Sequence, residues 1–278
     1  MTRIFKALAL AEELNAITKA RVAALPHAPR LVVLWREGDP AMAAYGARLK
    51  ASAEALGIRA DFRPYASGRE GLVAQFDAIK AESLDGIIPL YPLPPEVTPL
   101  EIASWIGPDR DLEGLHPINA GLLAGGVQGA LAPATARACL RILQHLLGDL
   151  KGREVCLVGA SRLVGRPLAQ LLLDAEASVT LCHAATKDLG AHLRRAEVVV
   201  TAAGVAGLIK GADLAEGAVV LDVSILRGPD GLQGDLDQGS AMGRASVISH
   251  VPDGVGPMTT ACLFEALLDQ IEGLIPRG

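Results

Sequence analysis

The stretch Val158-Gly-Ala-Ser-Arg-Leu-Val-Gly-Arg-Pro167 constrains the fold of this chain more than any other part of the sequence. An apolar run that suits a buried parallel strand precedes it, at residues 154–157. Helical spacing follows at 168–175, and 177–182 has the composition of a second strand. The glycines at 159 and 165 permit a tight turn, which lets the amides at the helix start face a pyrophosphate. This order of elements is typical of a nucleotide-binding βαβ unit.

The composition favours helices packed on a parallel sheet. Half of the 278 residues are hydrophobic but only 3% are aromatic, so the core must consist mainly of Ala, Leu and Val. The length suggests one large domain or two ordinary ones. The net charge of −5, without a basic cluster, argues against nucleic acid as a partner. Without a long apolar run or an apolar leader, we expect a soluble cytoplasmic protein with no membrane partner.

The cysteines give no sign of a metal or disulfide framework. All four lie in apolar segments without C-x-x-C spacing, at Cys139, Cys156, Cys182 and Cys262. This distribution predicts buried thiols in a reducing compartment. No Cys, His and carboxylate cluster has metal-ligand spacing, so we expect no metal.

The hydrophobic pattern predicts two α/β units. In the first, strands are expected at 30–35, 61–65 and 86–90, with helices at 6–24, 40–56 and 71–83. Asp39-Pro40 marks the start of the middle helix and Gly57 its end. A second series begins near Ala134, with strands at 154–158, 177–182, 197–202, 218–223 and 246–249 and a closing helix at 259–275. A cleft between two such units is where a ligand is expected.

Three further segments combine with the glycine turn into a specific pattern. They are Tyr91-Pro-Leu-Pro-Pro95, Asp111-Leu-Glu-Gly-Leu-His-Pro-Ile-Asn-Ala-Gly121 and Val251-Pro-Asp-Gly-Val-Gly-Pro-Met-Thr259. Cys182-His183 followed by Thr186, and Asp222-Val-Ser-Ile225 leading to Gly234-Asp235, complete it. Together these motifs resemble the bifunctional methylenetetrahydrofolate dehydrogenase/methenyltetrahydrofolate cyclohydrolase family, in the right order over nearly the whole chain.

The resemblance implies a fold of two α/β domains around a cleft, with a Rossmann-like nucleotide domain. It places a substrate domain for a folate-type one-carbon carrier at residues 1–117 plus 258–278. The dinucleotide-binding domain would then span 118–257. It also implies a homodimer formed through the nucleotide domain, and NAD or NADP as cofactor.

On the substrate side the chain departs from the family pattern. Tyr45 matches the family tyrosine, but Leu49 takes the position of its lysine and Leu90 that of its glutamine. Glu113 replaces an aspartate. The resemblance implies catalytic roles for Tyr45 and Glu113, and substrate contacts from Tyr45, Leu49, Leu90, Glu113, Gly256, Pro257 and Thr259. Asp253, in place of a family glycine, is either a further carboxylate near the cleft or a solvated loop residue.

The two family reactions make different demands on these residues. Hydride transfer mainly requires that two bound molecules be oriented. Hydrolysis of a methenyl bridge requires a positioned acid or base, which leucine cannot supply. We therefore expect a methylenetetrahydrofolate dehydrogenase whose cyclohydrolase activity is lost or impaired. The alternatives are a relative acting on another one-carbon substrate and a non-catalytic protein that binds a nucleotide or pterin.

The cofactor side departs as well. The resemblance implies cofactor contacts from seven residues: Gly159, Ala160, Ser161, Arg162, Gly165, Ala184 and Ile225. Ala160 and Ala184 stand where NADP-using relatives place an arginine and a serine for the 2′-phosphate. No acidic residue ends the second strand to bind a ribose diol, so NAD and NADP both stay open. Arg162 and Lys187 are either phosphate partners or solvated charges.

Overall fold

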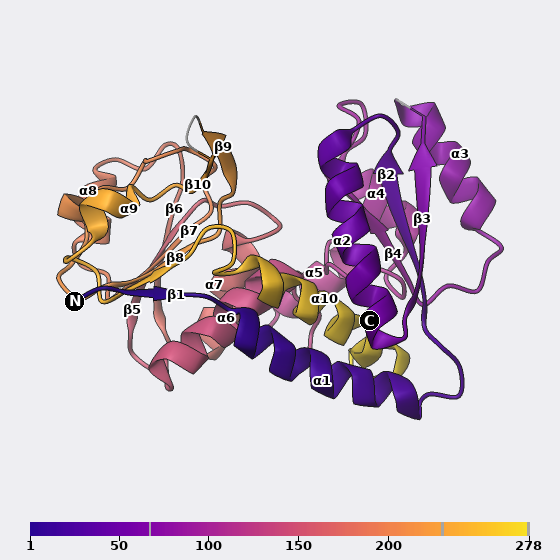
Figure 1. Ribbon diagram of the computed structural model, residues 1–278, viewed down its shortest axis with the longest axis horizontal. Coiled ribbons are helices and arrows are strands. Elements are labelled where there is room, and N and C mark those ends of the chain that lie inside the picture. The colour runs from indigo at the N-terminus through magenta and orange to yellow at the C-terminus, as the bar shows by residue number, and fades with distance from the viewer. Residues whose placement is uncertain (67, 229–230, 277–278) are drawn as a thin grey trace. The chain divides into compact units, whose positions relative to one another are not determined.

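The computed structural model describes residues 1–66, 68–228 and 231–276. The chain divides into two compact units (Figure 1). Unit 1 contains Met1–Glu12 and Ala132–Thr259, and unit 2 contains Glu13–Leu131 and Thr260–Gly278. The helices α1 (Leu8–Ala24) and α10 (Gly256–Ile271) each contribute residues to both units.

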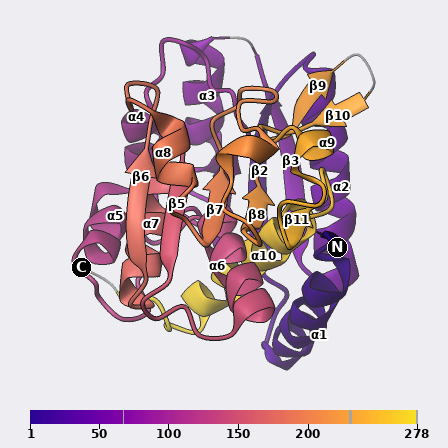
Figure 2. The same cartoon turned by 90° about the vertical axis from the view of Figure 1, so that its left-hand side faces the viewer.

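Unit 1 is built on a six-stranded parallel sheet in the order β1-β11-β8-β7-β5-β6 (Figure 2). Its strands are β1 (Arg3–Phe5), β5 (Glu154–Val158), β6 (Ser178–Cys182), β7 (Val198–Thr201), β8 (Val219–Asp222) and β11 (Val247–Ser249). The other elements are α6 (Ala134–Leu147), α7 (Gly165–Asp174), α8 (Leu189–Leu193), the 3₁₀ helix η1 (Gly211–Asp213), α9 (Gln238–Ala241) and the hairpin of β9 (Leu226–Gly228) and β10 (Gly231–Gln233). Alternate strand residues, among them Cys156, Val199 and Val220, pack with Leu193 of α8 and Ala241 of α9 in one core cluster.

Unit 2 is built on a three-stranded parallel sheet in the order β3-β2-β4. Its elements are β2 (Arg30–Arg36), α2 (Pro40–Leu56), β3 (Arg59–Tyr65), α3 (Arg69–Ile79), β4 (Gly86–Pro89), α4 (Pro99–Ile106) and α5 (Pro117–Ala124). Val32 and Ile87 share a core cluster with Phe76 of α3 and Ile102 of α4, so these two helices cover one face. Because strand residues alternate between faces, the opposite face is left for α2.

The sequence pattern predicted most of these elements within a few residues. The middle helix of unit 2 runs over Pro40–Leu56 as predicted, with Asp39 accepting hydrogen bonds from the amides of Ala41 and Met42. The elements that were not predicted are all short: β1, α4, α5, α8, η1, β9, β10 and α9. β1 has only three residues, too few for a hydrophobic pattern, and it exists because it pairs with β11. Residues 91–95, which contain three prolines, form no helix or strand.

The observed division of the chain differs from the boundaries expected from the resemblance. Residues 118–131 belong with unit 2, because α5 lies there, whereas the expected nucleotide domain began at 118. The first residues belong with unit 1, because β1 extends its sheet. The assignment of substrate and cofactor to the two units is taken up below as a proposal.

The four cysteines are free and buried. The sulfur atoms of Cys156 and Cys182 are 3.8 Å apart on neighbouring strands, and burial raises the pKa of Cys156 to about 12. Within the described ranges, no group of three or more His, Cys, Asp or Glu side chains is arranged to hold a metal ion. No helix in those ranges is both long and apolar enough to cross a membrane.

Candidate functional site

The glycine turn of unit 1 requires glycine at two of its positions. Gly159, directly after β5, has a φ of +113°, and a Cβ there would overlap the carbonyl of Ala202. Gly165 opens α7, and a Cβ on it would overlap the carbonyl of Gly159. The amide of Gly159 donates to the carbonyl of Cys182 at 2.9 Å, which joins the turn to the end of β6. The backbone therefore forms a tight turn, the glycine cradle, in which neither position has room for a side chain.

Two neighbouring turns border this cradle. In the first, Ser161 Oγ accepts from the amide of Val164 at 3.1 Å, while Arg162 is exposed. In the second, after β6, the amide of His183 donates to Thr186 Oγ1 at 2.9 Å. Because β5 and β6 are parallel neighbours, both turns lie at the same edge of the sheet. The structure thus brings Gly159, Ala160, Ser161, Arg162, Gly165 and Ala184 to one edge, as a shared nucleotide site requires.

A buried carboxylate fixes the loops at the next strands. Asp235 is fully buried and accepts from Thr201 Oγ1 at 2.7 Å and from the amides of Ala203 and Val205 at 2.6 and 2.8 Å. These bonds hold the chain that follows β7. A Cβ on Gly234, the residue before, would overlap the Asp222 carboxylate. The sequence reasoning used Gly234-Asp235 only for the resemblance and missed this structural role.

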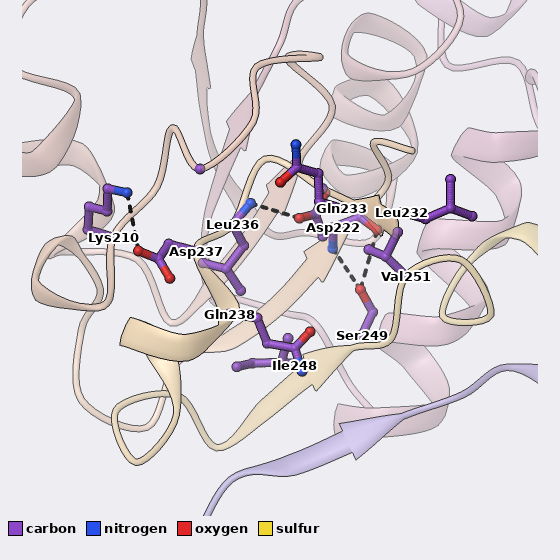
Figure 3. A pocket seen from close by; sticks show the side chains of 12 residues that line it. Lys210, Asp222, Leu232, Gln233, Leu236, Asp237, Gln238, Ile248, Ser249 and Val251 are labelled. Carbon is purple, nitrogen blue, oxygen red and sulfur yellow. Dashed lines mark hydrogen bonds and ion pairs between the residues drawn. The ribbon is translucent and has the colours of Figure 1, made fainter. Parts of the chain in front are cut away.

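Asp222 lines a pocket of about 280 Å³ at the ends of β8 and β11 (Figure 3). Its carboxylate accepts from the amides of Ser224 and Leu236 at 3.1 and 2.8 Å, and its own amide donates to Ser249 Oγ at 2.7 Å. Burial raises the pKa of Asp222 to about 6. Ile225, predicted to contact the cofactor, follows this anchored segment with 52% of its side chain exposed.

On α2, the side chains at positions 45 and 49 have different environments. Tyr45 is 37% exposed, whereas Leu49 is 1% exposed. Asp39 caps the start of α2, and Gly57, with a φ of +85°, ends it. Positions 45 and 49 therefore stand where the sequence motif placed them on the helix. Leu90, after β4, is 5% exposed and lies 4.0 Å from where a Cβ on Gly46 would stand. The side chains of Leu49 and Leu90 are therefore almost fully buried, and the substrate contacts expected of them stay a prediction.

The loop before α5 is organised by Asp111, a buried residue to which the sequence reasoning gave no role. Its carboxylate accepts from the amides of Glu113 and His116, at 3.1 and 2.8 Å, and from Asn119 Nδ2 at 2.9 Å. His116 Nδ1 accepts from the amide of Ile118 at 3.2 Å and so caps α5. His116 therefore has a structural role in this loop, and Asp111 holds the backbone of Glu113 in place.

Glu113 and Tyr45 are close enough to influence one another electrostatically. The Glu113 carboxylate is partly buried and has no hydrogen-bond or ion-pair partner within the described chain. Burial, and next the charge of Asp111, raise the pKa of Glu113 to about 7. Burial, and next the charge of Glu113, raise the pKa of Tyr45. The pair supplies a phenol and a carboxyl group that changes protonation near neutral pH.

The segment before and within the start of α10 contains the remaining predicted residues. Gly256 and Pro257 open the helix, and Thr259 Oγ1 bonds to the carbonyl of Val255 at 3.3 Å. Asp253 lies 3.7 Å from Lys6 Nζ and 3.4 Å from His250 Nδ1, and its carbonyl accepts from the amide of Ala7. Asp253 therefore joins this segment to the N-terminal residues of unit 1.

Comparison with known proteins agrees with this geometry. The sequence model of the tetrahydrofolate dehydrogenase/cyclohydrolase family, NAD(P)-binding domain, matches residues 133–274. The bifunctional protein FolD of Nocardia farcinica is 43% identical over 271 residues, which cover 95% of each chain. The FolD of Sphingopyxis alaskensis is 43% identical over 258 residues, covering 88% of this chain and 84% of that one.

Solved structures show the same similarity. The bifunctional FolD methylenetetrahydrofolate dehydrogenase/cyclohydrolase of Campylobacter jejuni superposes with a TM-score of 0.92 at 30% identity, covering 99% of this chain and all of that one. The Trypanosoma brucei enzyme, solved with an NADP cofactor and an inhibitor, has a TM-score of 0.90 at 27% identity and 98% coverage of both chains. The matched domain of this chain is thus an NAD(P)-binding domain, and its glycine turn is the part that a dinucleotide requires.

Proposed function

Because the chain belongs to the tetrahydrofolate dehydrogenase/cyclohydrolase family, we propose that it oxidises 5,10-methylenetetrahydrofolate with NAD or NADP. The observation that carries this proposal is the intact glycine cradle at Gly159 and Gly165, which no side chain fills. A bound NAD or NADP supplies the hydride acceptor. The rest of the reaction asks the protein only to bind and orient the folate.

The proposed roles of the chain's own residues follow from their positions. Ser161, Arg162 and the backbone at Ala160 and Ala184 would border the cofactor, with Ile225 against its reactive ring. In unit 2, ionised Glu113 would accept hydrogen bonds from the N–H groups of the pterin, and Tyr45 would pack against that ring. Glu113 suits this role because its backbone amide is bound by Asp111 and its carboxylate has no competing partner in the described chain. Gly256, Pro257 and Thr259 are proposed as further substrate contacts.

We propose that hydrolysis of the methenyl bridge is lost or strongly impaired. That reaction needs a group to move protons at the bridge, and such groups contribute roughly 10²- to 10⁴-fold to rates. The helix position that carries the family lysine holds Leu49, which is 1% exposed and packed. A buried hydrocarbon side chain neither takes up nor releases a proton. This supports a dehydrogenase that leaves the second step to another catalyst.

The test measures the two reactions separately. Reduction of NAD and of NADP is followed with methylenetetrahydrofolate as substrate, and hydrolysis with methenyltetrahydrofolate. We expect turnover with at least one nucleotide and hydrolysis at least about tenfold slower than in a bifunctional relative assayed alongside. Hydrolysis at the relative's rate would refute the proposed loss. The ratio of the two reduction rates decides between NAD and NADP.

A second candidate is oxidation of a different one-carbon substrate. It is favoured by the longer side chain of Glu113, which moves its carboxylate by about one methylene relative to an aspartate, and by the apolar Leu49 and Leu90. Saturable NAD or NADP binding without turnover of methylenetetrahydrofolate would favour this reading, or a non-catalytic binding protein. Turnover would exclude both. We also propose a homodimer, on the family resemblance, which light scattering of the purified protein would test.

A further inference from the structure

A charged groove lies in unit 2 between α3 and α4. Its volume is about 420 Å³. It is lined by Arg69, Val73, Phe76, Asp77, Ile79, Lys80, Ile87, Ser104, Trp105 and Arg110. Ile87 belongs to the sheet face that α3 and α4 cover. Tyr45 and Leu49 belong to α2 on the other face, where Gly46 approaches Phe62. The groove therefore lies on the other face of the sheet from Tyr45, which is proposed to pack against the pterin.

The groove concentrates positive charge on an acidic protein. Three of its side chains are cationic and one, Asp77, is acidic, although the whole chain carries a net charge of −5. Arg69 is already engaged, because its Nη1 donates to Glu101 Oε1 at 2.5 Å. Lys80 and Arg110 have no hydrogen-bond or ion-pair partner for their side chains among residues 1–66, 68–228 and 231–276. These two cations are therefore available to an anion.

The walls of the groove are apolar and aromatic. The rings of Phe76 and Trp105 meet edge to face, with centroids 5.5 Å apart. The Arg69 guanidinium lies over the Trp105 ring at 5.2 Å from its centroid, which fixes one face of the indole. Val73 and Ile87 complete the apolar lining. Half of the lining residues are apolar and half are polar or charged, and the volume lies within the range of sites that bind small molecules.

We propose that this groove binds a small oxyanion that carries an aromatic or aliphatic body. Arg110 and Lys80 would hold the phosphate or carboxylate oxygens, because a guanidinium offers a planar pair of donors and an ammonium a point charge. Trp105 and Val73 would pack against the body. An inorganic anion would satisfy only the charges, so the apolar walls select an organic one.

The groove is connected through the chain to Glu113. The carbonyl of Arg110 accepts from the amide of Ile87 at 3.1 Å, and the next residue, Asp111, pairs with Ile87. Asp111 in turn holds the backbone of Glu113 and His116. An anion that reorients Arg110 therefore acts next to the turn that places Glu113. Resting on the proposed function, the site would change the KM for the folate substrate.

The binding test uses the full chain and needs no catalytic activity. Trp35→Phe leaves Trp105 as the remaining tryptophan of the two in the sequence, and its fluorescence reports on the groove. The probes are phenyl phosphate, phenylacetate and inorganic phosphate. We expect a saturable change with at least one aromatic probe, and binding at least about fivefold weaker for inorganic phosphate. Preference for phenyl phosphate or for phenylacetate identifies the ligand as a phosphate or a carboxylate.

Charge variants in the same background locate the site. Arg110→Gln and Lys80→Gln should each weaken the aromatic probe at least about fivefold, the effect of losing one charged hydrogen bond. Arg59→Gln, the same change at an exposed position of β3 outside the groove, should leave affinity unchanged. No saturable change in the Trp35→Phe protein, or equal affinity in Arg110→Gln and Lys80→Gln, would overturn the site. If binding holds but the KM in wild type is indifferent to the probe, only the link to Glu113 is wrong.

Discussion

At Glu113, partial burial and repulsion from Asp111 raise the pKa to about 7, well above that of a free glutamate side chain. The charge of this side chain therefore changes near pH 7. A carboxylate accepts hydrogen bonds from a pterin, whereas a carboxylic acid must donate one. In the proposed role, Glu113 would therefore favour substrate binding when ionised and oppose it when protonated.

The KM for methylenetetrahydrofolate should fall as pH rises through about 7. The ionised fraction of Glu113 grows about tenfold between pH 6 and pH 8 for a pKa of about 7, and only that form is the proposed acceptor. Steady-state kinetics at a series of pH values measures the effect. Glu113→Gln should raise the KM and flatten its pH dependence. A profile of the same steepness in Glu113→Gln would show that another group titrates.

Leu49→Lys combined with Leu90→Gln should restore hydrolysis. A lysine alone at a position 1% exposed buries an unpaired ammonium, which we expect to destabilise the fold by about 3 kcal/mol or more. The glutamine supplies an acceptor, so the double variant should melt at a higher temperature than Leu49→Lys. We expect it to hydrolyse methenyltetrahydrofolate at least about tenfold faster than wild type. Leu56→Lys, also buried on α2, serves as the control that loses stability without gaining activity.

Among the elements, the turn between β5 and α7 depends most on backbone geometry. Gly159 and Gly165 leave no room for a Cβ, because each faces a backbone carbonyl. Gly159 also has a positive φ, a backbone conformation that residues other than glycine rarely adopt. The cradle therefore exists only where both positions are glycine. This is why a short sequence motif predicted a three-dimensional site.

Gly159→Ala should weaken NAD and NADP binding by about tenfold or more. The methyl group forces the turn away from Ala202, and a non-glycine residue in this backbone conformation costs about 1–3 kcal/mol. Calorimetric titration with each nucleotide measures the loss, and a melting curve confirms that the variant is folded. Gly121→Ala makes the same change on α5, where a Cβ meets nothing within 4 Å. Its nucleotide affinity should match wild type; an equal loss there would contradict the argument.

For the molecule as a whole, residues from the two ends of the chain meet in unit 2. Arg21 of α1 donates to Asp269 of α10 at 2.8 Å and to Glu272 at 2.9 Å. All three side chains are less than about a third exposed, so water screens the pairing less than at an open surface. The sequence separates these partners by nearly its whole length. The pairing joins α1 to the C-terminal part of unit 2.

Arg21→Ala should lower the free energy of unfolding by about 1–2 kcal/mol. The change removes three charge-assisted hydrogen bonds, one to Asp269 and two to Glu272, and leaves both carboxylates without this partner. Denaturant unfolding followed by circular dichroism measures it. Lys19→Ala, two residues away on the exposed side of α1, should change stability by no more than about 0.5 kcal/mol. Equal losses in both variants would show that helix propensity, rather than the ion pairs, is responsible.

The sequence by itself determined the α/β class, the glycine turn, the limits of α2 and the family. Each depends on residues close together in the chain. The spacing of apolar residues indicates helices and strands, Asp39-Pro40 begins α2 and Gly57 ends it, and the turn requires glycine at two positions. Through the resemblance it also predicted catalytic roles for Tyr45 and Glu113. It could not show β1, whose three residues become a strand only beside β11.

Tertiary structure alone decided the environments of the site residues. Burial and neighbouring charge set the protonation of Glu113 and Asp222, and both depend on residues that the chain brings together only on folding. Packing against neighbouring residues buried the side chains of Leu49 and Leu90 almost fully. The groove at Trp105 has no sequence motif, since its cations come from α3 and from the loop after α4. Local conformation is encoded in neighbouring residues, whereas burial and electrostatics sum over the whole fold.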